Sequence, residues 1–265
     1  MKQESRNAKT VKMTLRINDN EAVYWSNLFW TLAGETESFP RSLEQSVALA
    51  LPLAIVKLPK LGLGGFRNWL LHRGINIQVN GPDRPLRACL IAKAGRGLVA
   101  LDGSDPEDEQ RISLAHEVAH FLVDYLHPRQ QAMNLLGETA REVLDGERQP
   151  TLKEQVTGIL RGVELGVYTD LMDRPSTGII NKVGILAIED RAERIALELL
   201  APQDLILETI TLSGHSPVQP TSLEVVYDLL VQRFGLPSEM AKSYGNYIIS
   251  SQKAKTSFRE WLGMN

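Results

Sequence analysis

Apolar residues in the first quarter of the chain recur at the three- to four-residue spacing of amphipathic helices. Ser42, followed three residues later by Gln45, forms a capping-box pattern before one of them. Another short helix is predicted near residues 66–72, because the apolar cluster there is followed by Gly74. Residues 1–74 are therefore predicted to form an N-terminal helical region.

Three short β-prone runs come next along the chain. They are INIQV at residues 75–79, RACLIAK at residues 87–93 and LVALD at residues 98–102. The turn-forming sequences NGPD and AGRG separate them, as is typical of strands joined by short connections. We therefore expect a small, mostly antiparallel sheet after the helical region, and an α+β fold.

The clearest helix start in the sequence follows this sheet, in GSDPEDEQ. Asp105 is predicted as the N-cap and Pro106 as the first helical residue, with three acids in the first turn. We expect the helix to end near His127, directly before Pro128. A helical projection puts apolar residues on one side and a polar stripe on the other. The stripe consists of Ser113, His116, Glu117, His120, Asp124 and His127.

The sequence HEVAH within this helix is a metal-binding motif. His116 and His120 are four residues apart, so both imidazoles project from one face and can bind the same Zn²⁺ ion. Glu117 projects beside them and can take a proton from a water whose pKa the metal has lowered, then pass it to the leaving amine. Asp124, one turn beyond His120, can orient that histidine or be an ordinary exposed acid.

A catalytic zinc site also needs a third protein ligand. The later helix GILAIEDRAERIALELLAP, residues 184–202, carries Glu189 within its apolar stripe and Glu193 at the edge of that stripe. A carboxylate on a core-facing stripe is costly unless a cation or metal pairs with it, which makes Glu189 the predicted third ligand. Glu193 is a candidate for supporting it, and pairing of either acid with an arginine stays open. The HExxH frame favours zinc, although manganese or iron also bind two histidines and one carboxylate.

With both motifs in place, the chain resembles the ImmA/IrrE family of metallo-endopeptidases. The similar segments are RISLAHEVAHFLVDY, the preceding GRGLVALDGSDPEDEQ and the later IEDRAERIALELLAP, so the resemblance covers about residues 75–202. It implies a zincin-like core in which His116, His120 and Glu189 bind zinc and Glu117 is the general base. Family members cleave helix-turn-helix repressors and so relieve transcriptional repression, which makes such a repressor the implied substrate.

The chain departs from the family pattern at two places. Glu193 stands where the family often has Asn or Asp, and the gap between His120 and Glu189 is longer than in compact members. Residues from about 129 to 184 are therefore predicted to be a helical insertion in a metallopeptidase core of residues 75–210.

Residues 211–265 are predicted to form a C-terminal helical hairpin. Its short turn resembles that of a helix-turn-helix motif, but the second helix has only Lys242 before the late Lys253 and Lys255. The formal net charge of −3 also argues against general binding of nucleic acid. We therefore do not expect direct binding of nucleic acid.

Cysteine content and apolar runs indicate the compartment. Cys89 is the single cysteine, so an internal disulfide cannot form, which fits a reducing compartment. The basic N-terminus lacks the apolar region of a secretory signal. The longest apolar run, VALALPLAIV, is far shorter than the roughly 20 residues that cross a bilayer. We expect a cytoplasmic protein without a membrane span.

These observations predict a zinc-dependent endopeptidase that hydrolyses a peptide bond in a protein substrate through metal-activated water. The main alternative is a regulatory zinc protein that binds a repressor or another partner with little or no turnover. A third hypothesis, a DNA-associated regulator, depends on the C-terminal helices. The donor that would stabilise the oxyanion stays open among His127, His215, Tyr168 and Tyr125.

Overall fold

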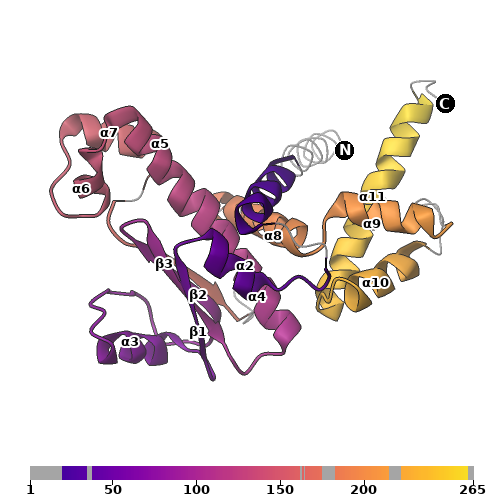
Figure 1. Ribbon diagram of the computed structural model, residues 1–265, viewed down its shortest axis with the longest axis horizontal. Helices are drawn as coiled ribbons and strands as arrows, with labels where there is room; N and C mark the ends of the chain where they lie inside the picture. The colour runs from indigo at the N-terminus through magenta and orange to yellow at the C-terminus, as the bar shows by residue number, and fades with distance from the viewer. Residues whose placement is uncertain are drawn as a thin grey trace, which may run out of the picture.

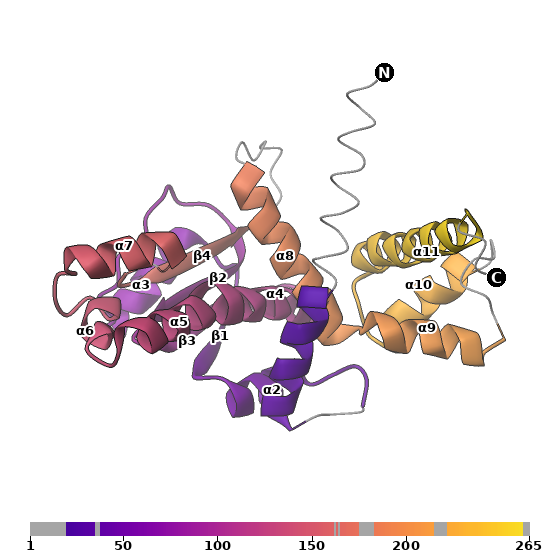
Figure 2. The same cartoon turned by 90° about the horizontal axis from the view of Figure 1, so that it is seen from above.

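The computed structural model describes residues 20–34, 38–161, 163, 165–174, 183–214 and 222–261. Within these ranges, helices surround a small mixed sheet of four strands, which confirms the predicted α+β class. The sheet and the helices packed on it form one end of the molecule, and the last three helices form the other (Figure 2). In this described part of the chain, no helix has the length and apolar character needed to cross a membrane.

The four strands lie in the order β1-β3-β2-β4. They are β1 (Leu53–Leu58), β2 (Leu86–Lys93), β3 (Arg96–Asp102) and β4 (Tyr168–Asp173). Strand β2 runs antiparallel to both of its neighbours, whereas β1 is parallel to β3. A tight turn at Ala94 and Gly95, both with positive φ, joins β2 to β3. Two of the three expected strands, and the mostly antiparallel pairing, are thereby confirmed.

The third expected strand, at residues 75–79, is absent: this segment is irregular and pairs with no strand of the described sheet. Arg67 of helix α3 (Leu63–His72) donates hydrogen bonds to the carbonyl oxygens of Val79 and Gly81, at 2.6 and 2.5 Å. A side chain thus satisfies backbone groups that a neighbouring strand would otherwise bind. The strand prediction here was wrong.

Strand β1 lies in the N-terminal region that was predicted to be helical. Helices do form over residues 20–33, in α2 (Leu43–Ala50) and in α3. Between them, however, the apolar run that contains Pro52 becomes an extended strand. Proline cannot continue helix α2, and the β-branched Ile55 and Val56 after it favour a strand. The expectation of a purely helical region was therefore wrong at β1.

The segment predicted to be a helical insertion, residues 129–184, is only partly helical. Its described helices are the remainder of α5 (His127–Leu136), α6 (Ala140–Leu144) and α7 (Leu152–Arg161). The segment also contains β4, which pairs with β2. Part of it therefore belongs to the sheet itself. Asp170 and Asp173 interrupt the apolar pattern of β4, which is why the sequence did not reveal the strand.

Different helices cover the two faces of the sheet (Figure 1). Ala88, Leu90 and Ala92 of β2 pack in the same apolar cluster as helix α4 (Glu107–His120). The alternate residues Cys89 and Ile91 pack with α3 on the opposite face. Because both faces are covered, β2 is apolar along most of its length.

Helix α4 begins one residue later than predicted. Pro106 occupies the N-cap position, and no side chain caps the helix. The predicted cap, Asp105, instead accepts a hydrogen bond from Arg174 at 2.7 Å. The helix start was therefore predicted to within one residue, but Asp105 is not its cap.

The helical path also continues past its predicted end at His127. A π-helical turn, η1 (Phe121–Leu126), follows α4 and leads directly into α5. Pro128 lies in the first turn of α5, where a proline needs no amide hydrogen. The path ends at Gly137, where φ is positive.

The remaining helices connect the sheet to the C-terminal end. They are α8 (Val183–Leu200), α9 (Gln203–Leu212), α10 (Ser222–Gln232) and α11 (Ser238–Trp261). Helix α8 packs along α4. Helices α10 and α11 form in the two segments that were expected to be helical, whereas α9 was not expected. Tyr244 of α11 donates a hydrogen bond to the carbonyl oxygen of Ala201 at 3.2 Å, which ties the hairpin to the end of α8.

Candidate metal centre

His116 and His120 lie one turn apart on α4 and are both buried. Their Nε2 atoms are 3.0 Å apart. Two nitrogens bound to one zinc ion at about 2.0–2.1 Å in tetrahedral geometry are about 3.3 Å apart. Two imidazole nitrogens this close must share either a proton or a metal ion. The predicted pairing of the two histidines is therefore present.

Glu189 reaches the same point from helix α8. Its Oε2 lies 3.2 Å from Nε2 of His116, and its Oε1 lies 3.7 Å from Nε2 of His120. The side chain is 38% exposed, so it lies at the margin of the core rather than on the core-facing stripe that the sequence indicated. Hydrogen bonds from the two histidines lower the pKa of Glu189 far below its ordinary value. The carboxylate is thus ionised and directed at the histidines.

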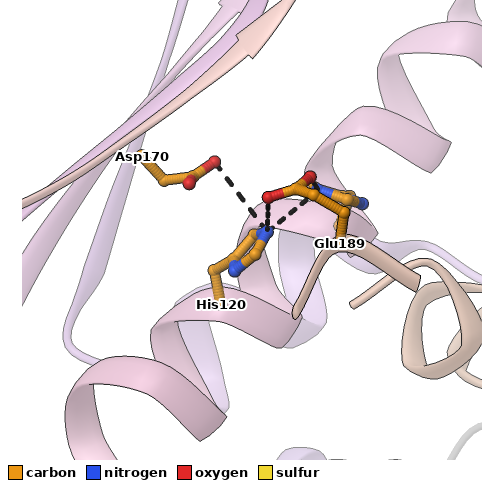
Figure 3. A group of neighbouring side chains, drawn as sticks. His120, Asp170 and Glu189 are labelled. Carbon is orange, nitrogen blue, oxygen red and sulfur yellow. Dashed lines mark hydrogen bonds and ion pairs between the residues drawn. The ribbon is translucent and has the colours of Figure 1, made fainter. Parts of the chain in front are cut away.

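Asp170 of β4 is the fourth member of the cluster, and the sequence did not reveal it. Its Oδ2 lies 3.8 Å from Nε2 of His120 (Figure 3). One ligand atom from each of His116, His120, Asp170 and Glu189 lies within 4.8 Å of the others, a spacing that could hold a metal ion. Alternating residues of a strand share one face, so an extended YTDLM segment puts Asp170 on one face with Tyr168 and Met172. This pattern was the sequence signal that could have revealed Asp170.

Asp124 holds His120 from the other side of its ring. The Oδ2 atom of Asp124 lies 2.8 Å from Nδ1 of His120, and Arg191 of α8 contacts its Oδ1. This is the orienting contact that the sequence left open, so Asp124 is not an ordinary exposed acid. Burial disfavours protonation of His120, but hydrogen bonds to Asp124 and Glu189 raise its pKa to about 11. The surplus of carboxylates at this point attracts a cation, either a proton or a metal ion.

Glu117 is completely buried beside the cluster. Neither of its carboxylate oxygens has a hydrogen-bond partner among the described residues. Burial raises its pKa well above the ordinary value, and the charges of Asp170 and Glu189 add to this effect. A buried carboxyl group without a partner costs free energy, and groups of this kind are often retained because they act on a bound molecule.

Comparisons with protein-family models, curated proteins and solved structures gave no match for this chain. The resemblance to the ImmA/IrrE family therefore stays a prediction. What the cluster can do has to be argued from its own atoms: two imidazoles, two carboxylates and an unpaired buried glutamate.

A cavity of about 250 Å³ adjoins His116. Ser113 and Ile112 of α4, Met172 of β4 and Met240 of α11 are among its walls. The hydroxyl of Ser113 is buried and has no hydrogen-bond partner in the described structure. The walls of the cavity are mixed, because three charged residues also line it: Arg87, Asp173 and Glu193.

A second cavity, of about 380 Å³, lies on the other side of α8 against α9 and α11. Tyr244, Tyr247 and Asp190 line it, but no member of the metal cluster does. We place the chemistry at the cavity beside His116, because only that one touches a candidate ligand.

The remaining predicted site residues lie outside the cluster. Glu193 is exposed and is not among the four candidate ligands. His127 is exposed and packs edge-on against Trp25, with ring centroids 5.0 Å apart. Its Nε2 lies 2.7 Å from Nε2 of Gln131. These contacts turn His127 away from a role in stabilising an oxyanion.

The two tyrosine candidates, Tyr125 and Tyr168, lie beside each other. The hydroxyl of Tyr125 accepts a hydrogen bond from the amide of Gly95 at 2.7 Å. Tyr168 lies with its ring centroid 6.0 Å from that of Tyr125. His215 lies outside the described residues.

Proposed function

We propose that this chain is a zinc-dependent endopeptidase with a zincin-like core. The observation that supports the proposal most is the convergence of His116, His120 and Glu189 next to Glu117, whose buried carboxyl lacks a partner. HExxH peptidases need this combination: ligands from two helices and a carboxyl group ready to act as a base.

The donor set fits zinc. Two imidazole nitrogens and one carboxylate oxygen form a ligand set of catalytic zinc sites, and the spacing of their atoms agrees with a single ion. Manganese and iron also bind two histidines and a carboxylate, so the identity of the metal comes from the HExxH frame. When bound, zinc would lower the pKa of a water molecule towards neutrality and polarise the scissile carbonyl.

The protein residues supply the rest of the chemistry. Asp124 keeps Nδ1 of His120 occupied, so that Nε2 faces the ligand position. Glu117 accepts the proton of the attacking water and returns it to the leaving amine. Burial raises the pKa of this carboxyl, which makes its ionised form a stronger base towards the attacking water. Burial of Glu117 also keeps bulk water from competing for that proton.

The substrate is a protein, and by the ImmA/IrrE resemblance a helix-turn-helix repressor cleaved in the cytoplasm. The cavity beside His116 supports a peptide substrate, because its walls offer both apolar and charged contacts next to a candidate ligand. Relief of repression would be the biological result. Direct contact with nucleic acid is not part of this proposal.

One observation favours the alternative of a regulatory zinc protein with little or no turnover. Asp170 adds a fourth donor to the cluster, and a zinc ion with four protein ligands has no position for water. The two functions differ in what Glu117→Gln does. It removes the base but keeps the ligands, so it should abolish cleavage and leave partner binding intact.

The experiment is cleavage of purified helix-turn-helix repressors, followed by mass spectrometry, with wild type beside Glu117→Gln. We expect a defined cut by the wild type that falls at least about a hundredfold in the variant. Asp190→Asn is the matched control, because Asp190 is an exposed neighbour of Glu189 that pairs with Arg194. Stable binding of a repressor without any cut by the wild type would instead support the regulatory alternative.

A further inference from the structure

The position of Asp170 has a consequence for how the metal is held. Its Oδ2 lies 3.8 Å from Nε2 of His120, almost the same distance as the 3.7 Å from that nitrogen to Oε1 of Glu189. Figure 3 shows the two carboxylates approaching the same nitrogen from different elements, Asp170 from the strand and Glu189 from the helix. Asp170 is therefore as near to His120 as Glu189 is, although only Glu189 also contacts Nε2 of His116, at 3.2 Å.

The number of protein ligands determines whether the metal can still bind a water molecule. Catalytic zinc sites have three protein ligands and a fourth position for water or substrate, whereas structural sites have four protein ligands. His116, His120, Glu189 and Asp170 offer one ligand atom each. If all four bind the metal, no position remains for the water that hydrolysis requires.

The strand that carries Asp170 is at the edge of the sheet. In the described part of the chain β4 pairs only with β2, and the pairing shifts register between Leu86 and Ala88. Helices α4 and α8, which carry the other three ligands, pack directly on each other. A ligand on a strand held along one side can move more easily than ligands on two packed helices.

Charge favours coordination of Asp170 when a metal ion is present. Asp170 is mostly buried close to Glu117, Glu189 and Asp124, and the three acids repel its carboxylate unless a cation lies between them. Binding of the metal relieves this repulsion, and withdrawal of Asp170 exposes one position while the other three ligands keep the ion.

We propose that Asp170 is a fourth, displaceable ligand of the metal, and that its coordination keeps the centre closed until the strand or a substrate displaces it. The inference depends on the proposed function, since it assumes a metal at His116, His120 and Glu189. It assigns to β4 a regulatory role that combines the two functions discussed above: a closed resting state and an open hydrolytic state.

The test compares wild type with Asp170→Ala and Asp170→Asn. Asp173→Asn is the matched control, because Asp173 lies on the same strand but is exposed and paired with Arg84 at 2.5 Å. Zinc affinity is measured by competition with a chromophoric chelator. We expect Asp170→Ala to weaken zinc binding by at least about tenfold, since loss of even an indirect partner of a metal ligand costs about that much. The control should bind zinc like wild type.

The second readout reports whether a ligand position is open. Each protein is loaded with Co²⁺ and titrated with acetohydroxamate, a small metal-binding probe, while the visible absorption of the cobalt is recorded. If Asp170 occupies its position about nine-tenths of the time, acetohydroxamate should bind Asp170→Ala about tenfold more tightly than wild type. Asp170→Asn keeps the shape of the side chain and carries the same test if the alanine variant does not fold.

The two measurements distinguish failure of the role proposed for Asp170 from failure of the proposed peptidase function. Equal zinc affinity, or equal acetohydroxamate affinity, in wild type and the Asp170 variants would overturn the role of Asp170 and leave the peptidase proposal intact. A wild type that binds neither zinc nor Co²⁺ would remove the proposed function, and the inference with it.

Discussion

The Oδ2 atom of Asp124 lies 2.8 Å from Nδ1 of His120, which precedes it by one turn on the same helical path. Arg191 of α8 contacts the other oxygen of that carboxylate. Asp124 thus connects the second histidine of HEVAH to the helix that carries Glu189. It fixes the orientation of the ring, so that Nε2 faces His116 and the two candidate carboxylate ligands.

This contact predicts the effect of Asp124→Asn on metal binding. An asparagine keeps the shape but holds the imidazole less firmly and no longer attracts Arg191. We expect zinc affinity to fall by about 10- to 100-fold while the fold is retained. Chelator competition measures the affinity, and circular dichroism checks the fold. An unchanged affinity would show that His120 is oriented by packing alone.

Glu117→Leu should abolish hydrolysis and stabilise the folded protein. The leucine removes a buried carboxyl that has no hydrogen-bond partner among the described residues and replaces it with an apolar group of similar size. Hydrolysis should be lost, while the free energy of unfolding of the metal-free protein should rise by about 1–3 kcal/mol. Urea unfolding in the presence of a chelator measures this change. A destabilised variant would indicate that Glu117 has a partner that holds it in the folded protein.

Asp102 predicts a pH dependence of stability away from the metal centre. Burial acts to raise its pKa, but hydrogen bonds from the Ser104 amide and from Arg174 outweigh it and lower the pKa below 3.8. A lowered pKa in the folded state stabilises the protein above the unfolded-state pKa. That stability is lost as the pH falls through the folded-state pKa.

We therefore expect Asp102→Asn to reduce the free energy of unfolding at neutral pH by about 1–3 kcal/mol. The difference from wild type should shrink as the pH falls below 3.8. Urea unfolding curves at neutral pH and at about pH 3 make the comparison. A difference of the same size at both pH values would exclude the charge of Asp102 as its cause.

The close packing around Gly97 predicts that a larger residue at this position destabilises the sheet. A Cβ atom at this position of β3 would meet Phe121 at 2.7 Å and would overlap Leu53. Gly97→Ala should therefore cost about 1–3 kcal/mol of unfolding free energy, as overpacking of a core usually does. Gly65→Ala is the control: Gly65 is exposed on α3, with nothing within 4 Å of an added Cβ. It should stabilise the protein slightly, by up to about 1 kcal/mol.

The histidine motif could be predicted from sequence because its geometry is local. His116 and His120 are four positions apart on one helix, and this spacing determines their separation independently of the rest of the fold. Glu189 was predicted from a helical pattern that is also local. The structure brings it to the histidines, though from a more exposed position than its stripe suggested.

Features that depend on distant pairing were not predicted. Strand β4 is defined by its pairing with β2, and its own sequence, with two acids in six residues, does not read as a buried strand. Asp170 was missed for that reason. The strand prediction for INIQV was wrong for the opposite reason. Its residues are β-prone, but they pair with no strand of the described sheet, and Arg67 binds the backbone there instead. Local propensity is overridden where tertiary contacts supply the hydrogen bonds.

The central claim is that His116, His120 and Glu189 bind one zinc ion. The most direct measurement is the zinc content of the purified protein by elemental analysis, with wild type beside His116→Ala and Glu189→Ala. The account predicts about one zinc per chain in the wild type, lost or strongly reduced in both variants. A wild type that contains no zinc, and takes up none when zinc is supplied, would contradict it.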